Sequence, residues 1–273
     1  MEPLATIKHI ICIASGKGGV GKSTTAVNLA VALHQQGYST GLLDADIYGP
    51  SLPLMLGVAD GTRPQVKPGK IMLPLVAHGI ETNSIGFLVD AKTAMVWRAP
   101  MIVGAFNQLL LNTQWSALDY LIIDLPPGTG DIQLSLTQTA RISGAVIVTT
   151  PQDVALSDAR KGMEMFRKVR VPLLGVVENM SQHVCSNCGH VEAIFGEGGG
   201  DRLAQDFDIP LIGSLPLDRL IRSQGDSGTP VTIAQPDGPI ARAYHSLGDA
   251  LRDRLAQQVE ARPAAPTIDV TDD

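Results

Sequence analysis

The fold is decided by the stretch Ser15-Gly16-Lys17-Gly18-Gly19-Val20-Gly21-Lys22-Ser23-Thr24. Residues 16–23 match the pattern G-x-x-x-x-G-K-S of a phosphate-binding loop, in which glycines let backbone N–H groups wrap an anion. An apolar run at 9–14 precedes the loop and a helical pattern at 24–33 follows it. The helix, beginning near Gly21, directs its positive dipole end at the same anion. Strand, loop and helix in this order predict a nucleotide-binding α/β fold.

Individual roles follow from the chemistry of the loop. We predict that every residue from Gly16 to Thr24 contacts the nucleotide. Lys22 is expected to reach the β- and γ-phosphates of ATP, and the Ser23 hydroxyl to bind Mg²⁺.

Two later strands are predicted to end in carboxylates. The run 38–46 ends in Asp44 and Asp46, and the run 119–124 ends in Asp124. Ligands of parallel α/β sheets gather at the carboxyl ends of the strands, so we expect all three to face the phosphates. The two-residue period of a strand would place Asp44 and Asp46 on one side. Asp124 is expected near Mg²⁺ through a water, as in a Walker B strand. Carboxylates in an exposed turn are the alternative for Asp44 and Asp46.

The remaining sequence continues the alternation of strand and helix. Strands are predicted at 79–87, 144–150, 173–180 and 211–215, a hairpin at 66–71, and helices at 100–115, 154–169 and 239–259. In the helix at 100–115, the inward side chains are expected to be Met101, Phe106, Leu109 and Leu110. We predict a doubly wound, mostly parallel sheet with helices on both faces, in one domain over residues 1–261. The Pro/Ala-rich acidic tail at 262–273 is expected to be disordered.

Composition narrows the function classes. The 273 residues carry a formal charge of −6, and aromatic residues make up only 4%. This balance disfavours a nucleic-acid surface, which needs clustered Lys and Arg and stacking rings. No signal peptide is visible, and no apolar run is long enough to span a bilayer. Three cysteines do not make a disulfide framework. We therefore expect a cytoplasmic protein that binds neither nucleic acid nor membrane.

The three cysteines differ in their expected roles. Cys185 and Cys188 form a C-x₂-C pair within a predicted metal-binding loop at 181–200, whereas Cys12 lies in the first strand as a buried apolar residue. Iron–sulfur clusters and structural zinc both take four ligands, so one pair is half a site. Either His183 and His190 complete a zinc site within one chain, or two chains each contribute a pair.

The last predicted ligand is Asn179. It lies at the C-terminal end of the predicted strand at 173–180, and its amide offers both a donor and an acceptor that can pair with the edge of adenine.

Taken together, the motifs resemble the Mrp family of ATP-binding iron–sulfur cluster carriers, also called ApbC, which are related to the deviant-Walker ATPases MinD and ParA. The resemblance covers residues 8–260 and rests on the motifs at 16–24, 44–51, 125–131, 178–180 and 185–190. It implies slow ATP hydrolysis and a homodimer in which Cys185 and Cys188 of each subunit share a [4Fe–4S] cluster. The cluster would be received from donors and passed to apoproteins.

The same resemblance assigns a catalytic set of Lys17, Lys22 and Asp46. Lys17 would cross a nucleotide-sandwich dimer, and Asp46 would position the attacking water; a solvated surface lysine is the alternative for Lys17. Longer family members have an extra N-terminal domain or an N-terminal cysteine cluster, and we expect neither of them here.

Other function classes compete with this interpretation. The main one is a MinD/ParA-like positioning ATPase with a structural zinc site. A nitrogenase-reductase-like electron donor is disfavoured because the loop at 125–131 contains no cysteine.

Overall fold

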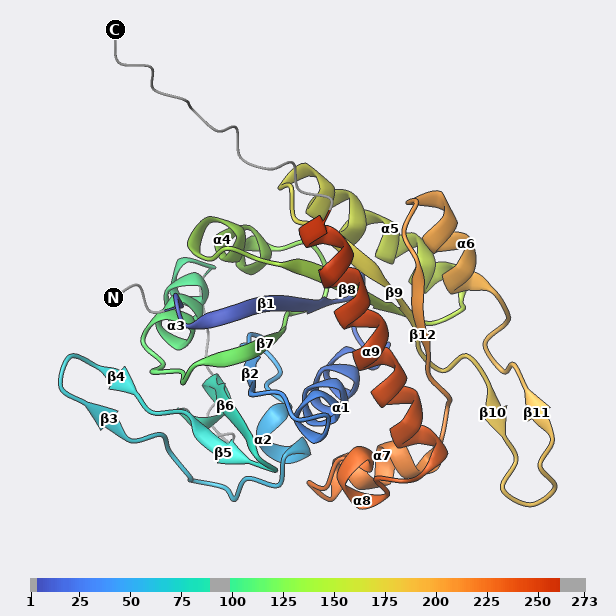
Figure 1. Cartoon of the computed structure of the whole chain (residues 1–273), viewed down its shortest axis with the longest axis horizontal. Helices are drawn as coiled ribbons and strands as arrows, with labels where there is room; N and C mark the ends of the chain where they lie inside the picture. Colours follow the sequence, from blue (N-terminus) through green and yellow to red (C-terminus); the bar gives the residue numbers. More distant parts are fainter. Residues whose placement is uncertain (1–3, 89–98, 261–273) are drawn as a thin grey trace, which may run out of the picture.

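The computed structural model describes residues 4–88 and 99–260, and an eight-stranded sheet lies at its centre (Figure 1). The strands of this sheet are β1 (Ile7–Ala14), β2 (Thr40–Asp44), β5 (Leu75–Ala77), β6 (Ile80–Ser84), β7 (Leu118–Asp124), β8 (Gly144–Thr149), β9 (Leu173–Glu178) and β12 (Leu211–Ser214). Their spatial order is β12-β9-β8-β1-β7-β2-β6-β5. All neighbours pair in parallel except β5 and β6, which are antiparallel.

Helices cover both faces of the sheet. One face carries α1 (Lys22–Gln35), α2 (Leu52–Met55), α7 (Arg219–Asp226), α8 (Val231–Ala234) and α9 (Pro239–Glu260). The other carries α3 (Ala99–Leu111), α4 (Asp131–Thr139), α5 (Asp153–Lys168) and α6 (Gly199–Asp206). The predicted doubly wound, mostly parallel α/β fold is therefore confirmed.

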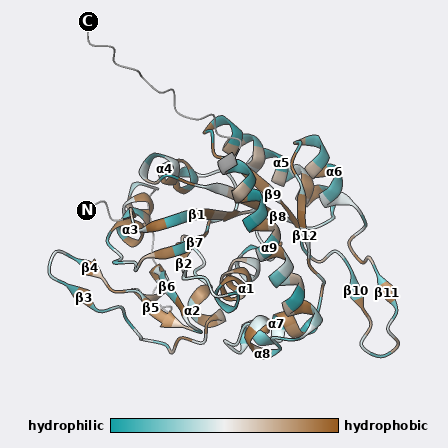
Figure 2. Cartoon of the chain, in the orientation of Figure 1, coloured by the Kyte–Doolittle hydropathy of each residue, from teal (hydrophilic) through white to brown (hydrophobic). Residues whose placement is uncertain are grey.

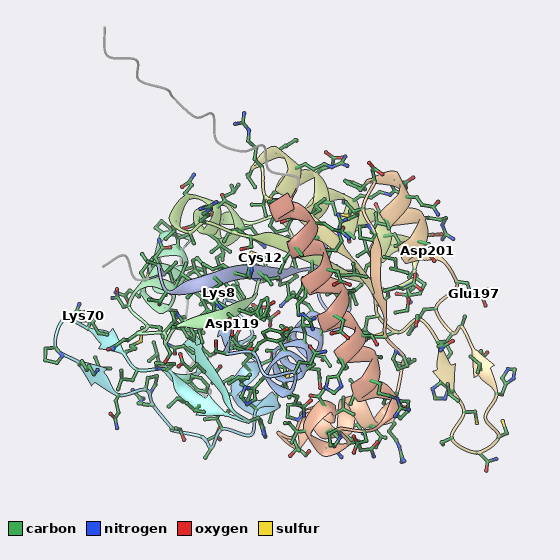
Figure 3. All side chains as sticks on the ribbon, viewed as in Figure 1. Lys8, Cys12, Lys70, Asp119, Glu197 and Asp201 are labelled. Atoms are coloured by element: carbon green, nitrogen blue, oxygen red, sulfur yellow. The ribbon has the colours of Figure 1, made fainter. Side chains whose placement is uncertain are left out.

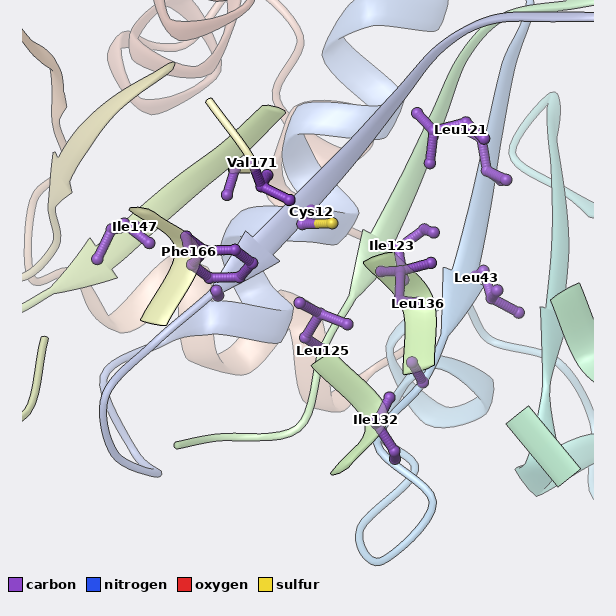
Figure 4. Packing of buried hydrophobic residues seen from close by; sticks show 14 of the residues in the cluster. Cys12, Leu43, Leu121, Ile123, Leu125, Ile132, Leu136, Ile147, Phe166 and Val171 are labelled. Atoms are coloured by element: carbon purple, nitrogen blue, oxygen red, sulfur yellow. The ribbon is translucent and has the colours of Figure 1, made fainter. Parts of the chain in front are cut away.

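Two apolar clusters lie between the sheet and its helices. The one under α3 to α6 contains Phe106, Leu136 and Phe166. Leu136 and Phe166 are labelled in Figure 4. The one under α1 and α9 contains Leu29 and Tyr244. Colouring by hydropathy shows the inner strands as a mainly hydrophobic layer (Figure 2). Because both faces are covered, strands such as β8 and β9 are buried at every position, which explains why their sequences are apolar up to the last residue.

Cys12 belongs to the first of these clusters. Its side chain is fully buried in β1, and burial raises the pKa of its thiol. The prediction that Cys12 is a buried apolar residue is confirmed.

The helix predicted at 100–115 is shorter than expected. It ends at Leu111, because the following backbone pairs with β4 (Ile71–Met72): Met72 N donates to Asn112 O at 2.7 Å, and Gln114 N donates to Met72 O at 2.8 Å. The inward position predicted for Met101 was wrong, since this side chain is 53% exposed. Ile102, one helical turn before the buried Phe106, occupies the core position instead.

Other elements follow the predictions with shifted ends. The hairpin predicted at 66–71 is formed by β3 (Val66–Lys67) and β4. The strand predicted at 79–87 divides into β6 and a short 3₁₀ helix, Ile85–Phe87. A separate two-stranded ribbon joins β10 (His183–Val184) and β11 (Val191–Glu192) and projects from the body (Figure 1).

Two further expectations concern the tail and the membrane. The tail at 262–273 lies outside the described residues. Within 4–88 and 99–260, no helix combines the length and apolar content needed to cross a membrane.

Candidate nucleotide site and cysteine hairpin

The phosphate-loop sequence lies between β1 and α1, at the carboxyl edge of the sheet. Gly19 and Gly21 have φ values of 82° and 85°, a left-handed conformation that favours glycine. A Cβ on Gly16 would collide with the backbone of Asp158 in α5. Close packing therefore requires glycine at position 16, and backbone conformation favours it at positions 19 and 21.

Lys22 lies against two of the three predicted carboxylates. Its Nζ is 2.6 Å from Asp124 Oδ1 and 4.0 Å from Asp46 Oδ2, and its side chain is only 6% exposed. Burial raises the pKa of Asp124, although the contact with Lys22 opposes this shift. The structure thus brings the phosphate-loop lysine and the acid at the end of β7 into direct contact.

The oxygens around Lys22 fit a magnesium ion. Asp124 Oδ2 is buried and has no hydrogen-bond partner among the described residues. The Ser23 hydroxyl lies close by, at 3.3 Å from Lys22 Nζ. Carboxylate and hydroxyl oxygens are donors that Mg²⁺ prefers, directly or through water. Ser23 and Asp124 are therefore the residues that would hold Mg²⁺ beside a bound nucleotide.

Asp44 is the register partner of Asp124 across the β2–β7 pair and is fully buried. Its Oδ1 accepts from Asp46 N at 3.1 Å, and its Oδ2 accepts from Leu52 N at 3.3 Å and Ser84 Oγ at 3.0 Å. Burial, followed by the charge of Asp124, raises the pKa of Asp44 to about 7. In this arrangement both oxygens of Asp44 fix the turn that follows β2.

Asp46 lies in that turn and not in the strand, because β2 ends at Asp44. The argument from the two-residue period therefore fails, but Asp46 still faces Lys22. Burial raises the pKa of Asp46, and Lys22 acts in the opposite direction. A cavity of about 520 Å³ adjoins Asp46 and is lined by Tyr48, Pro127 and Gln133 among others.

Gln133 is a site residue that the sequence did not reveal. It is buried near the start of α4, where its Nε2 donates to Pro126 O at 2.9 Å and to Gly128 O at 3.1 Å. Gly128 N in turn donates to Ser15 O at 2.9 Å. The loop at 125–131 is thus tied both to α4 and to the phosphate loop.

Asn179 follows β9 and is only 5% exposed. Its Nδ2 donates to Val20 O at 2.8 Å, inside the phosphate loop. Its contact with adenine stays a prediction.

The cysteine pair occupies the tip of the β10–β11 ribbon. Cys185 is half-buried and Cys188 is exposed. Cys185 N donates to His190 O at 2.8 Å and Gly189 N donates to Cys185 O at 2.9 Å, which closes the tip. The backbone N–H groups of Cys188 and then Asn187 lower the pKa of the Cys185 thiol. Backbone donors therefore favour the thiolate, which is the form that ligates metals.

The two histidines do not complete a site within this chain. His183 Nδ1 lies 3.0 Å from the carbonyl oxygen of Leu217, and His190 is exposed. In the part of the chain that the structure describes, no group of three or more His, Cys, Asp or Glu side chains could hold a metal. The zinc alternative within one chain therefore has no support in the geometry.

The fold and the phosphate loop define the class of a P-loop NTPase. The model of the ParA family described as the NUBPL iron-transfer P-loop NTPase matches residues 6–252. The chain is 59% identical over 244 residues to the iron–sulfur cluster carrier protein of Pseudomonas fragi, an alignment that covers 89% of this chain and 85% of that protein. It is 54% identical to the carrier protein of Escherichia coli strain K12, covering 94% of this chain and 69% of that protein.

A solved structure agrees with these relatives. The nucleotide-binding protein of Archaeoglobus fulgidus in complex with ADP superimposes with a TM-score of 0.75 at 36% identity, over 89% of this chain and 94% of that one. This chain belongs to the NUBPL iron-transfer P-loop NTPases of the ParA family.

Proposed function

We propose that this chain is an ATP-hydrolysing iron–sulfur cluster carrier. Two copies hold one [4Fe–4S] cluster between their Cys185 and Cys188 pairs and pass it to apoproteins after receiving it from a donor. The observation that carries this proposal is the cysteine pair at the tip of a projecting ribbon, without a third ligand among the described residues. The names of the relatives, which describe iron–sulfur cluster carriers, support it.

The nucleotide half of the proposal rests on Lys22. On nucleotide binding, Lys22 exchanges its contact with Asp124 for the β- and γ-phosphates. Ser23 and Asp124 would then hold Mg²⁺, which when bound neutralises charge on the phosphates. Asp46, at the side of the cavity, would accept a hydrogen bond from the attacking water and orient it.

Lys17 completes the proposed catalytic set. It is half-exposed, and no carboxylate of the described residues lies within ion-pair distance of it. A cation in this position is available to the nucleotide of a second copy.

The exposed surface of the β10–β11 ribbon supports the proposal that a second copy of the chain binds beside the cysteines. Neighbouring residues of a strand point to opposite faces, so Val184 and Val191 share one face, and His183 and Glu192 share the other. His183 contacts Leu217 of the body, and Val184 and Val191 are 43% and 53% exposed. An apolar face thus lies next to each thiol pair. Two ligands per chain, one of them exposed, would hold a cluster loosely, as transfer requires.

The decisive experiment is anaerobic reconstitution with iron and sulfide, followed by iron and sulfide analysis, absorption spectroscopy and mass measurement in solution. We expect one cluster per two chains with a broad thiolate-to-iron absorption band. Cys185→Ser and Cys188→Ser should each lose the cluster and its transfer while they still bind nucleotide. Cys12→Ser, the matched control, should keep both.

Three outcomes would contradict this function. They are a complete cluster on a monomer, a cluster that survives Cys185→Ser, and a colourless protein that holds zinc instead of iron.

A further inference from the structure

Two adjacent residues at the end of β9, Glu178 and Asn179, contact both functional regions. They are 6% and 5% exposed. Asn179 N donates to Thr149 O at 2.8 Å, and Leu215 N donates to Glu178 O at 2.9 Å, so neighbouring strands hold this backbone on both sides. The two side chains leave this fixed backbone toward different loops.

The Asn179 side chain fixes one peptide of the phosphate loop. Its Nδ2 donates to the carbonyl of Val20, which is joined to Gly21 by a trans peptide bond. The C=O and N–H of a trans peptide point in opposite directions, so this hydrogen bond turns the Gly21 N–H away from Asn179. A Cβ on Gly21 would collide with the Asn179 amide nitrogen, which shows how closely the two pack. Asn179 therefore orients a backbone donor of the anion-binding loop.

The Glu178 side chain fixes the far end of the cysteine-bearing segment, 181–198. Its Oε2 accepts from the backbone N–H of Gly200, in the first turn of α6. A Cβ on Gly200 would lie 2.8 Å from Glu178 Cβ, so the backbone also approaches closely there. The near end is fixed as well, because Ser181 N donates to Leu215 O at 3.0 Å.

We propose that Glu178 and Asn179 are positioning residues that couple the phosphate loop to the cysteine-bearing segment. Nucleotide binding moves Lys22 away from Asp124 and shifts the Val20–Gly21 peptide, whose N–H faces the anion. Through its hydrogen bond to Val20 O, Asn179 passes this shift to the cysteine-bearing segment, which begins two residues later. Coupling is reciprocal, so a ligand on the cysteines must also change nucleotide affinity. The use of this coupling in cluster release rests on the proposed function, but the coupling itself is measurable on the free thiols.

The test measures the alkylation rates of Cys185 and Cys188 by iodoacetamide in the full cluster-free chain, with and without saturating Mg²⁺–ADP. Mass spectrometry reads each site, and the buried Cys12 serves as an internal unreactive reference. We expect ADP to slow alkylation of the pair by about fivefold or more in the wild type. Asn179→Ala should remove this response even at saturating ADP. Glu178→Ala should raise the alkylation rate without ADP and reduce the response.

Matched variants separate coupling from simple loss of structure. Asn179→Asp keeps the side-chain volume but has no donor for Val20 O, so it should also lose the response. Ser181→Ala removes the hydrogen bond from Ser181 Oγ to Leu215 O but no contact with the phosphate loop, so it should keep the response. Each rate is compared with that of the same variant without ADP.

The reciprocal measurement uses alkylated protein. Alkylation of Cys185 and Cys188 should weaken ADP binding in the wild type and leave it unchanged in Asn179→Asp. A wild-type alkylation rate that does not respond to bound ADP would overturn the coupling, as would a full response in Asn179→Asp. Failure of cluster reconstitution would contradict the proposed function and leave these thiol measurements valid.

Discussion

Two lysine–aspartate pairs lie at opposite ends of strand β7 and have the same length. At the amino end, Lys8 Nζ is 2.6 Å from Asp119 Oδ1; at the carboxyl end, Lys22 Nζ is 2.6 Å from Asp124 Oδ1. The side chains of the first pair are 71% and 24% exposed, and those of the second 6% and 0%. Lys8 and Asp119 are labelled in Figure 3. The two regions therefore differ in burial and not in distance.

The pKa values of the two aspartates shift in opposite directions, for different reasons. A hydrogen bond from Lys8, followed by one from Ser39, lowers the pKa of Asp119 to about 2. Desolvation raises the pKa of Asp124 in spite of Lys22. Asp119 is thus hydrogen-bonded by its neighbours, whereas one buried oxygen of Asp124 has no hydrogen-bond partner in the residues that the structure describes. At the same distance, Lys8 and Asp119 form a surface ion pair at the amino end of β7. At the carboxyl end, Lys22 and Asp124 are buried groups that can bind an anion and a cation respectively.

The strongest test of this difference is Lys22→Ala. Removing the buried cation should weaken nucleotide binding by about 100-fold or more, because truncating one partner of a desolvated charge contact costs about 2–5 kcal/mol. Titration with a fluorescent ADP analogue measures the loss, and thermal unfolding shows whether the chain still folds.

The matched control for Lys22→Ala is Lys17→Ala, in the same loop but half-exposed. It should keep ADP binding to a single chain and lose most of the turnover of ATP. If Lys22→Ala bound ADP as tightly as the wild type, the buried pair at the carboxyl end of β7 would have no role that the exposed pair at the amino end lacks.

The titration of Asp44 is expected to have an intermediate effect, on how the free energy of unfolding depends on pH. Its pKa is about 7 in the folded chain, against an ordinary value of 3.8. Since the folded chain keeps this proton where the unfolded chain has lost it, the free energy of unfolding falls as pH rises from about 4 to about 7. The upper limit of the slope is about 1.4 kcal/mol per pH unit, and it belongs to the coupled pair of Asp44 and Asp124.

Urea unfolding across this pH range measures the slope. Asp44→Asn should flatten it, because the variant has no proton to lose at this position. Parallel curves for wild type and Asp44→Asn would show that burial at the carboxyl end does not retain the proton.

Sequence reasoning succeeded where local patterns determine the structure. The glycine spacing of the phosphate loop predicts a strand, a turn and a helix start, and α1 does begin at Lys22. The acid at the end of β7 faces Lys22 because parallel strands present their carboxyl ends at one edge. Apolar runs without alternation correctly indicated a sheet covered on both faces.

The missed features depend on contacts between distant segments. The helix predicted at 100–115 ends early because its last residues pair with Met72, far back in the sequence. The tie between Glu178 and Gly200 spans an irregular segment that has no periodicity to read. Gln133 is one polar residue on a short helix, and only the folded loop shows that it binds Pro126 and Gly128. Such hydrogen bonds have no signature in a single sequence.

The smallest expected effect belongs to the surface pair. Lys8→Ala should lower the free energy of unfolding by about 0.2–1 kcal/mol at neutral pH, the range for exposed ion pairs. Asp119 keeps hydrogen bonds from Ser39 N at 2.9 Å and Ser39 Oγ at 2.7 Å, so its carboxylate stays solvated and bonded without Lys8.

Acid and salt provide two further measurements of the same pair. The folded pKa of Asp119 lies below its ordinary value of 3.8, so its contribution is present above pH 3.8 and disappears as pH falls through about 2. The difference between wild type and Lys8→Ala should therefore vanish toward pH 2, and should also shrink in about 1 M salt, where the Debye length is near 3 Å. A loss of several kcal/mol at neutral pH would mean that distance alone sets the strength of these pairs. The contrast between the two ends of β7 would then be wrong.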